Sequence, residues 1–290
     1  MRASSSTLFK LSMNIRAFFF GLVTVSGLAR KGFFVPYRYA GRIPLPGENT
    51  SYVALMDTFA ARERVFEKVL VLVDSYADDL LRIDSEPPPA PRWKQDWYPR
   101  LDAATLYSFV RSHLPKRIIE VGSGHSTRFI ARAIFDGKIP CAVTAIDPAP
   151  RATLRGLNID FIESTVQQVR TAPFEMLEPG DFLVIDSSHV LMPGSDVDFI
   201  LNRVLPMLPA GVWVHFHDIF LPEDYPVEWG WRGYNEQNAV AQLTLSGFET
   251  EFSSRYAVTR MRPLLEKTIL GRLPIQPGAY ETSLWLRKVS

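Results

Sequence analysis

The distribution of apolar and polar positions predicts an α/β fold for most of the chain. From about residue 100 onward, short apolar runs bounded by polar turns alternate with stretches in which apolar residues recur every three or four positions. Such alternation of strand and helix is typical of a doubly wound, mostly parallel sheet. We expect strands at residues 117–122, 142–147, 158–163, 181–186, 211–217, 248–253 and 282–289.

A long amphipathic pattern precedes this region. From residue 52 to residue 83, apolar residues recur at helical spacing, which predicts a long helical stretch and leaves a helical hairpin or a homodimer open. Prolines at 87, 88, 89 and 91 then interrupt the chain. We therefore expect three parts: a basic, partly apolar segment (1–50), a helical appendage with a proline-rich linker (51–90), and a larger α/β domain (91–290).

The N-terminal segment combines apolar residues with unbalanced positive charge. The apolar run 17–29, taken as a helix, would span about 20 Å, less than the roughly 30 Å hydrocarbon core of a bilayer. A cleaved signal peptide, an interfacial membrane helix within residues 10–34 and a helix packed on the protein itself stay open. We expect a cytoplasmic protein, with peripheral contact at the inner face of a membrane as one option. Seven cationic residues precede the first acidic residue, Glu48: Arg2, Lys10, Arg16, Arg30, Lys31, Arg38 and Arg42.

Overall charge and cysteine content exclude several classes of function. A net charge of +1 gives no reason to expect a nucleic acid or another polyanion as partner. A single cysteine, Cys141, excludes both a disulfide framework and a cysteine-rich metal site.

The turn after the first predicted strand is the strongest candidate for a cofactor site. Gly122, Ser123 and Gly124 separate this strand from a helix that has Ser126 or Thr127 as its N-cap. Glycines let a ligand approach the backbone closely, and the free N–H groups of the helix N-terminus favour an anionic or polar ligand. The next strand ends in Asp147, where a ribose diol would be held. The dinucleotide fingerprint requires a third glycine where Thr127 stands, which disfavours, but keeps as an alternative, an NAD(P)-dependent oxidoreductase.

The stretch from Glu120 to Thr127 resembles motif I of the class I S-adenosylmethionine-dependent methyltransferases. It is similar to a bacterial small-molecule branch with Asp-x-x-His and His-Asp signatures, found here at 186–189 and 217–218. The resemblance covers about residues 100–289 and implies a Rossmann-like, seven-stranded sheet whose last strand inserts antiparallel. It departs from the common family pattern at Ser126, which replaces a third glycine. It implies S-adenosyl-L-methionine as cofactor, bound by Glu120, Gly122, Ser123, Gly124, Ser126, Asp147, Glu163 and Asp186.

Two carboxylates follow neighbouring predicted strands. Asp186 and Asp218 should project side by side, because adjacent strands lie about 4.8 Å apart, and such a pair either shares a cation or raises the pKa of one member. Oxygen ligands favour Mg²⁺. The pattern matches that of the catechol-type O-methyltransferases, except that Ile219 stands where those enzymes usually have Asn, which leaves the third ligand open.

The remaining candidates concern the acceptor. A metal-bound hydroxyl, or His189 or His217 as general base, would remove the acceptor's proton, so that Asp186, His189 and His217 are the catalytic candidates. The absence of an Asn/Asp-Pro-Pro-aromatic motif after the fourth strand disfavours a nucleic-acid base as acceptor. We expect methyl transfer to a small molecule, at a hydroxyl oxygen.

A non-catalytic module, in which residues 1–83 bind a membrane or a partner, is the alternative of another class. A substrate lid, or an aromatic cluster that anchors the loop, is expected from Tyr225, Trp229, Trp231 and Arg232.

Overall fold

The computed structural model describes the backbone of residues 5–44 and 51–290, with side chains from residue 15 onward within these ranges. The chain forms two compact units, residues 1–45 and 46–290. The predicted boundary at residue 50 lies outside the described residues, as do the side chains of residues 10–14.

The smaller unit contains the helix α1 (Ser5–Val25) and a single 3₁₀ turn, η1 (Ala40–Arg42). The observed helix does not coincide with the apolar run 17–29. The helix begins twelve residues earlier, and it stops at Val25 because Gly27 takes a left-handed conformation with φ of 75°. None of the helices in the described ranges combines the length and the apolar character that a membrane span requires.

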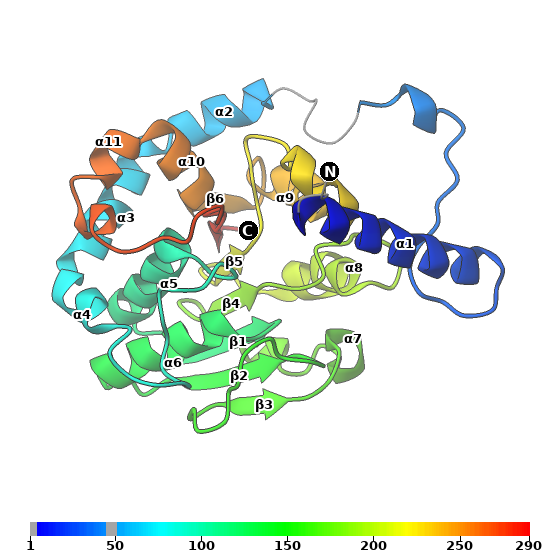
Figure 1. Ribbon diagram of the computed structural model, residues 1–290. Helices are drawn as coiled ribbons and strands as arrows, with labels where there is room; N and C mark the ends of the chain where they lie inside the picture. Colours follow the sequence, from blue (N-terminus) through cyan, green and yellow to red (C-terminus); the bar gives the residue numbers. More distant parts are fainter. Residues whose placement is uncertain (1–4, 45–50) are drawn as a thin grey trace. The chain divides into compact units, whose positions relative to one another are not determined.

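The larger unit is built on a seven-stranded sheet with the order β3-β2-β1-β4-β5-β7-β6. Strands β1 to β5 run parallel, whereas β7 pairs antiparallel with both β5 and β6 (Figure 1). This architecture confirms the predicted doubly wound, Rossmann-like sheet with an inserted antiparallel last strand. The strands are β1 (Arg117–Val121), β2 (Ala142–Ile146), β3 (Asp160–Ile162), β4 (Phe182–Ile185), β5 (Trp213–Phe216), β6 (Phe248–Ser253) and β7 (Leu284–Lys288).

Helices cover both faces of the sheet, which is why its central strands are almost entirely buried. All four residues of β4 are fully buried, as expected for a strand with helices on either side. In Figure 1, α5 and α6 lie on one side of the sheet and α7 and α8 on the other. The helices of this part are α5 (Arg100–His113), α6 (His125–Gly137), α7 (Val166–Val169), α8 (Asp196–Phe199), α9 (Glu236–Leu243), α10 (Ser254–Arg260) and α11 (Arg262–Leu265).

The amphipathic stretch 52–83, predicted to be helical, forms three successive helices. These are α2 (Val53–Ala60), α3 (Glu63–Ser75) and α4 (Ala77–Arg82). Their apolar faces pack into the core of the larger unit: the rings of Phe59 and Tyr256 stack at 5.9 Å, and those of Phe66 and Phe252 meet edge to face at 5.7 Å. The chain bends at Arg62, whose Nε donates a hydrogen bond to the Thr250 carbonyl in β6.

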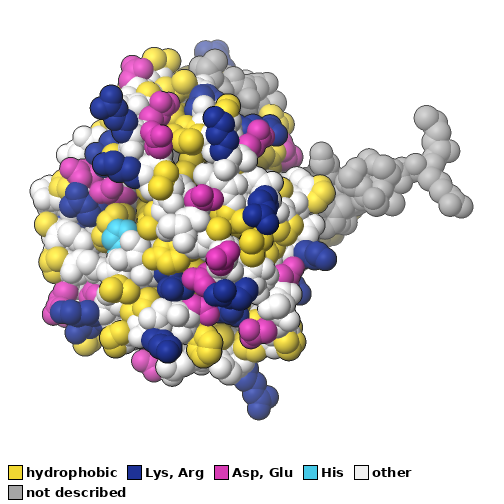
Figure 2. Space-filling model, turned by 90° about the vertical axis from the view of Figure 1, so that its left-hand side faces the viewer, with side chains coloured by type: hydrophobic (Ala, Val, Ile, Leu, Met, Phe, Trp, Pro, Cys, Tyr) yellow, Lys and Arg dark blue, Asp and Glu magenta, His cyan; other side chains and the backbone are white. Residues whose placement is uncertain are grey.

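One face of the molecule carries side chains of both charges. On the face shown in Figure 2, the described Lys and Arg side chains are interspersed with Asp and Glu, and they form no extended area of one sign. This distribution agrees with the small net charge of +1.

Candidate active site

The predicted cofactor residues gather at the carboxyl ends of the parallel strands. The strand order reverses between β1 and β4, and ligands of open α/β sheets bind at such a switch point. Gly122, directly after β1, has φ of +81°, and a Cβ atom there would lie 1.8 Å from the carbonyl oxygen of Asp186 after β4. Only glycine therefore fits at this position, where the two strand ends approach each other most closely.

Glu120, in the strand that precedes the glycine turn, is hydrogen-bonded to the residues that form it. Its Oε2 accepts a hydrogen bond of 2.5 Å from Thr127 Oγ1, and Thr127 Oγ1 in turn accepts one of 2.9 Å from the Gly124 N–H. The Glu120 side chain is fully buried, and its Oε1 has no hydrogen-bond partner among the described residues. Burial, with help from the charges of Asp186 and Asp147, raises the pKa of Glu120 to about 8 despite the hydroxyl groups that hydrogen-bond to it.

Asp147 ties the same turn to the end of β2. Its Oδ2 accepts hydrogen bonds from the Ser123 N–H at 2.6 Å and from Ser123 Oγ at 3.2 Å, and its Oδ1 accepts one from the Ala149 N–H at 2.7 Å. The structure therefore gives Asp147 a local structural role in addition to the predicted contact with a ribose. Glu163 is exposed just beyond β3, whereas Ser126 is buried in the first turn of α6.

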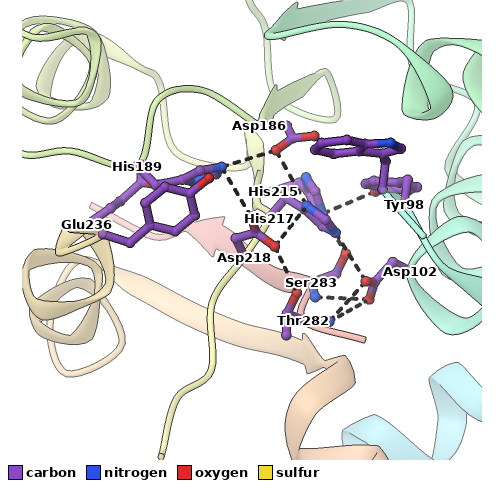
Figure 3. A network of polar contacts seen from close by, with 12 residues as sticks. Tyr98, Asp102, Asp186, His189, His215, His217, Asp218, Glu236, Thr282 and Ser283 are labelled. Carbon is purple, nitrogen blue, oxygen red and sulfur yellow. Dashed lines mark hydrogen bonds and ion pairs between the residues drawn. The ribbon is translucent and has the colours of Figure 1, made fainter. Parts of the chain in front are cut away.

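Carboxylates and imidazoles form a cluster where β4 and β5 end (Figure 3). One ligand atom each from Asp186, His217 and Asp218 lies within 4.8 Å of the others, which is a grouping that could hold a metal ion. His217 Nδ1 is 3.4 Å from Asp186 Oδ1 and 3.6 Å from Asp218 Oδ1. The structure thus brings together the two carboxylates that strand adjacency predicts and adds a histidine as the third candidate ligand.

Asp102, on the first turn of α5, orients His217 from behind. Its Oδ2 lies 3.2 Å from His217 Nε2, and its carboxylate accepts hydrogen bonds of 2.9 Å from the N–H groups of Thr282 and Ser283. Burial alone would raise the pKa of Asp102, but the contact with His217 and the backbone donors lower it. An ionised Asp102 that accepts the proton of Nε2 leaves Nδ1 of His217 facing Asp186 and Asp218.

His189 is surrounded by three carboxylates. Nδ1 lies 2.9 Å from Glu236 Oε2, and Nε2 lies 3.3 Å from Asp186 Oδ1 and 3.5 Å from Asp218 Oδ2. Burial works to lower the pKa of His189, but these carboxylates outweigh it and raise the pKa well above its usual value. Tyr234 packs on the imidazole, with ring centres 4.6 Å apart.

His215, deeper in β5, takes no part in this charge cluster. It is fully buried, and its Nε2 contacts Tyr98 Oη at 3.2 Å and Ser283 Oγ at 2.8 Å. Burial and the neighbouring His217 lower its pKa to about 3, so this imidazole is neutral. Tyr98 also packs on His217, with ring centres 4.7 Å apart, and in this way connects the two histidines.

The aromatic loop after β5 divides into an anchored part and a part that faces the cluster. Tyr225 is buried and stacks with Trp229 at 6.5 Å. The guanidinium of Arg232 lies 3.9 Å above the Trp229 ring, and its Nη1 is 4.0 Å from Asp218 Oδ2. Trp231 is 60% exposed. Arg232 is therefore the predicted loop residue that the structure brings to the carboxylates.

Comparison with known proteins supports the class of protein that the glycine turn predicts. Residues 119–219, from within β1 to just past β5, match the family model of a methyltransferase domain. This segment is a little over a third of the chain. An uncharacterised protein of Archaeoglobus fulgidus is 34% identical over 89 residues, which cover 28% of this chain and 39% of that protein. The chain thus matches about two fifths of the length of this relative.

Several solved methyltransferase structures are distantly similar to the chain. An S-adenosylhomocysteine-bound methyltransferase from Podospora anserina is 16% identical, with a TM-score of 0.43, over 89% of this chain and all of that one. An O-methyltransferase from Bacillus cereus with S-adenosylhomocysteine is 13% identical, with a TM-score of 0.37, over 77% of this chain and 91% of that one. Likeness of this degree carries no information about substrate.

Proposed function

We propose that this protein transfers a methyl group from S-adenosyl-L-methionine to a hydroxyl oxygen of a small molecule. The observation that carries the proposal is the cluster of Asp186, His217 and Asp218 directly beside a glycine turn at the switch point of the sheet. A cofactor site and a cation site at adjacent strand ends would place a methyl donor next to a polarised acceptor. The match of residues 119–219 to a methyltransferase domain supports the methyl-transfer part of this proposal.

The residues of the glycine turn fit this cofactor. When bound, S-adenosylmethionine supplies an electrophilic methyl group on a sulfonium ion. Glu120 has a buried Oε1 without a partner in the described structure, and this acceptor suits the ammonium group of the cofactor's methionine part. Asp147 and the exposed Glu163 would accept hydrogen bonds from its ribose and adenine. Asp186 and backbone groups beside it would complete the contacts with the cofactor. These backbone groups belong to Gly122, Ser123, Gly124 and Ser126.

Asp186, His217 and Asp218 would hold a divalent cation such as Mg²⁺ or Mn²⁺. Two carboxylates and one imidazole are ligands that these ions accept, and His217 supplies the third ligand that Ile219 cannot. Bound there, the cation supplies Lewis acidity toward an acceptor hydroxyl. Four carboxylates, from Asp102, Asp186, Asp218 and Glu236, face two imidazoles and the guanidinium of Arg232, and the remaining excess of acids over bases favours a cation.

The other residues of the site position these groups and exclude water. Asp102 fixes the ring of His217, and Glu236 fixes that of His189. Arg232, stacked on Trp229, covers Asp218 from the side of the aromatic loop and would serve as the substrate lid together with Tyr225 and Trp231.

Titration calorimetry with S-adenosylhomocysteine and, separately, NADH tests the cofactor. We expect the wild type to bind only S-adenosylhomocysteine, and Asp147→Ala to bind it at least about tenfold more weakly, because it loses a buried charged acceptor. Since Asp147 also holds the turn, Glu163→Ala serves as a second variant and Asp160→Ala, at the opposite end of β3, as the control. Binding of NADH, or no binding of S-adenosylhomocysteine by the folded wild type, would refute the proposal.

Calorimetry with Mn²⁺ tests the cation independently. Asp218→Asn should lose Mn²⁺ binding and keep S-adenosylhomocysteine binding, whereas Asp160→Asn should keep both. If the wild type does not bind Mn²⁺ or Mg²⁺ in the presence of S-adenosylhomocysteine, the cation part of the proposal is wrong, and the cofactor part is unaffected.

A further inference from the structure

Most of the exposed apolar side chains of α1 share one face of the helix, and the less exposed Phe20 lies away from that face. Ile15, Phe18, Phe19, Leu22 and Val25 are all exposed, and Phe18 is 66% exposed. Their spacing of three and four residues places them on a single stripe of the helix. A stripe of this width normally faces a protein core or another apolar phase, because its exposure to water is unfavourable.

A second apolar group follows the turn at Gly27. Leu28 is 81% exposed, and Phe33, Phe34 and Val35 are exposed as well. Throughout residues 15–44, every described side chain is exposed except those of Val23 and Thr24, which are half-buried. This unit therefore has no apolar core of its own among its described side chains.

The charge of this segment identifies the surface that it fits. Cations are interleaved with the apolar residues, and no acidic residue occurs before Glu48. Arg16 lies 5.1 Å from the ring centre of Phe20, and Arg30 lies 5.2 Å from that of Phe33. Aromatic side chains beside arginine are typical of segments at the boundary between lipid headgroups and acyl chains.

We propose that residues 15–44 bind the surface of an anionic lipid bilayer. The apolar stripe of α1 enters the headgroup region, and Arg16, Arg30 and Lys31 contact the anionic lipids. The helix lies in the plane of the interface, since Lys10 and Arg16 interrupt its apolar sequence. A second copy of the chain is a poorer partner, because it would oppose cations with cations. This inference does not depend on the proposed methyl transfer.

Vesicle sedimentation of the full-length protein tests the proposal. We expect binding to phosphatidylcholine vesicles that contain phosphatidylserine, weaker binding to phosphatidylcholine alone, and a loss of binding with rising salt. Phe19→Glu should bind at least about tenfold more weakly, because a large apolar side chain no longer enters the interface. Arg30→Gln should bind about fivefold more weakly. The control is Phe135→Glu on α6, a phenylalanine that is 77% exposed in the larger unit and should bind like the wild type.

Two measurements without lipid distinguish the other uses of this face. Thermal unfolding would show a lower Tm for Phe19→Glu than for Phe135→Glu if the stripe packed on the protein itself. Light scattering would show a smaller mass for Phe19→Glu if the stripe joined two copies of the chain. Either result, or equal sedimentation of all variants, would overturn the proposal.

Discussion

The buried Glu120 should make the stability of this protein fall as the pH rises through the neutral range. Its pKa is about 8 in the folded protein, chiefly because of burial, against an ordinary value of 4.5. Below pH 4.5 the carboxyl group is protonated in both the folded and the unfolded chain. Between pH 4.5 and 8 the folded protein retains a proton that the unfolded chain has lost, so deprotonation favours unfolding with each step up in pH.

The size of the effect follows from the distance between the two pKa values. They lie about 3.5 pH units apart, and each unit corresponds to about 1.4 kcal/mol, so Glu120 lowers the free energy of unfolding by up to about 5 kcal/mol across this window. Glu120→Gln keeps an oxygen that can accept the hydrogen bond from Thr127 Oγ1 and removes the ionisable group. The variant should therefore lose this pH dependence and be the more stable protein above pH 8.

Urea unfolding followed by circular dichroism from pH 5 to 8.5 measures this difference. The free energy of unfolding of the wild type should decrease over this range relative to that of Glu120→Gln. Glu175→Gln, at an exposed position, controls for the loss of one formal charge. Parallel curves for the wild type and Glu120→Gln would show that Glu120 ionises with no penalty, and the argument from its burial would then be wrong.

Two further variants test the construction of the site. Asp102→Asn presents an amide N–H to His217 Nε2, so that the proton of the ring moves to Nδ1, the nitrogen that faces Asp186 and Asp218. We therefore expect about ten- to hundredfold weaker Mn²⁺ binding in calorimetry, with an unchanged circular dichroism spectrum. An unchanged affinity would contradict the orienting role of Asp102. Gly122→Ala places a Cβ atom against the Asp186 carbonyl and should lower the free energy of unfolding by more than about 3 kcal/mol in urea titration, whereas Gly21→Ala, whose Cβ atom meets nothing within 4 Å, should not.

The edge of the sheet that carries the site was predictable because it depends on local rules. Period-2 and apolar runs locate the strands, and parallel strands direct their carboxyl ends to one edge. Asp186 and Asp218 could therefore be paired from the sequence alone, and the pairing of β4 with β5 bears this out.

The residues that hydrogen-bond to His217 and His189 at this edge could not be predicted, because they come from distant parts of the chain. Asp102 lies 115 residues before His217, and Glu236 lies 47 residues after His189. Thr282 and Ser283 reach Asp102 only because β7 inserts beside β5. In the sequence, Asp102 and Glu236 read as ordinary acids in the first turn of a helix, a position that favours negative charge on any helix.

The ends of the helices between residues 52 and 83 could not be predicted from the sequence either. Periodicity reports which positions are apolar, and a bend of one or two residues barely changes the spacing. The break at Arg62 is fixed by its hydrogen bond to the Thr250 carbonyl, a contact across 188 residues. The apolar pattern therefore located the buried faces, and the tertiary partners determined where each helix ends.

The carboxylates around His189 connect two hypotheses that the sequence left as alternatives, a metal-assisted acceptor and a histidine base. The negative charges of Asp186, Asp218 and Glu236 raise the pKa of His189 well above its usual value, which favours the protonated ring. A protonated imidazole accepts no proton. A cation that neutralised Asp186 and Asp218 would leave Glu236 as the one carboxylate on the ring, and the pKa of His189 would then fall toward the range of a base. A bound cation would thus favour the role of general base predicted for His189.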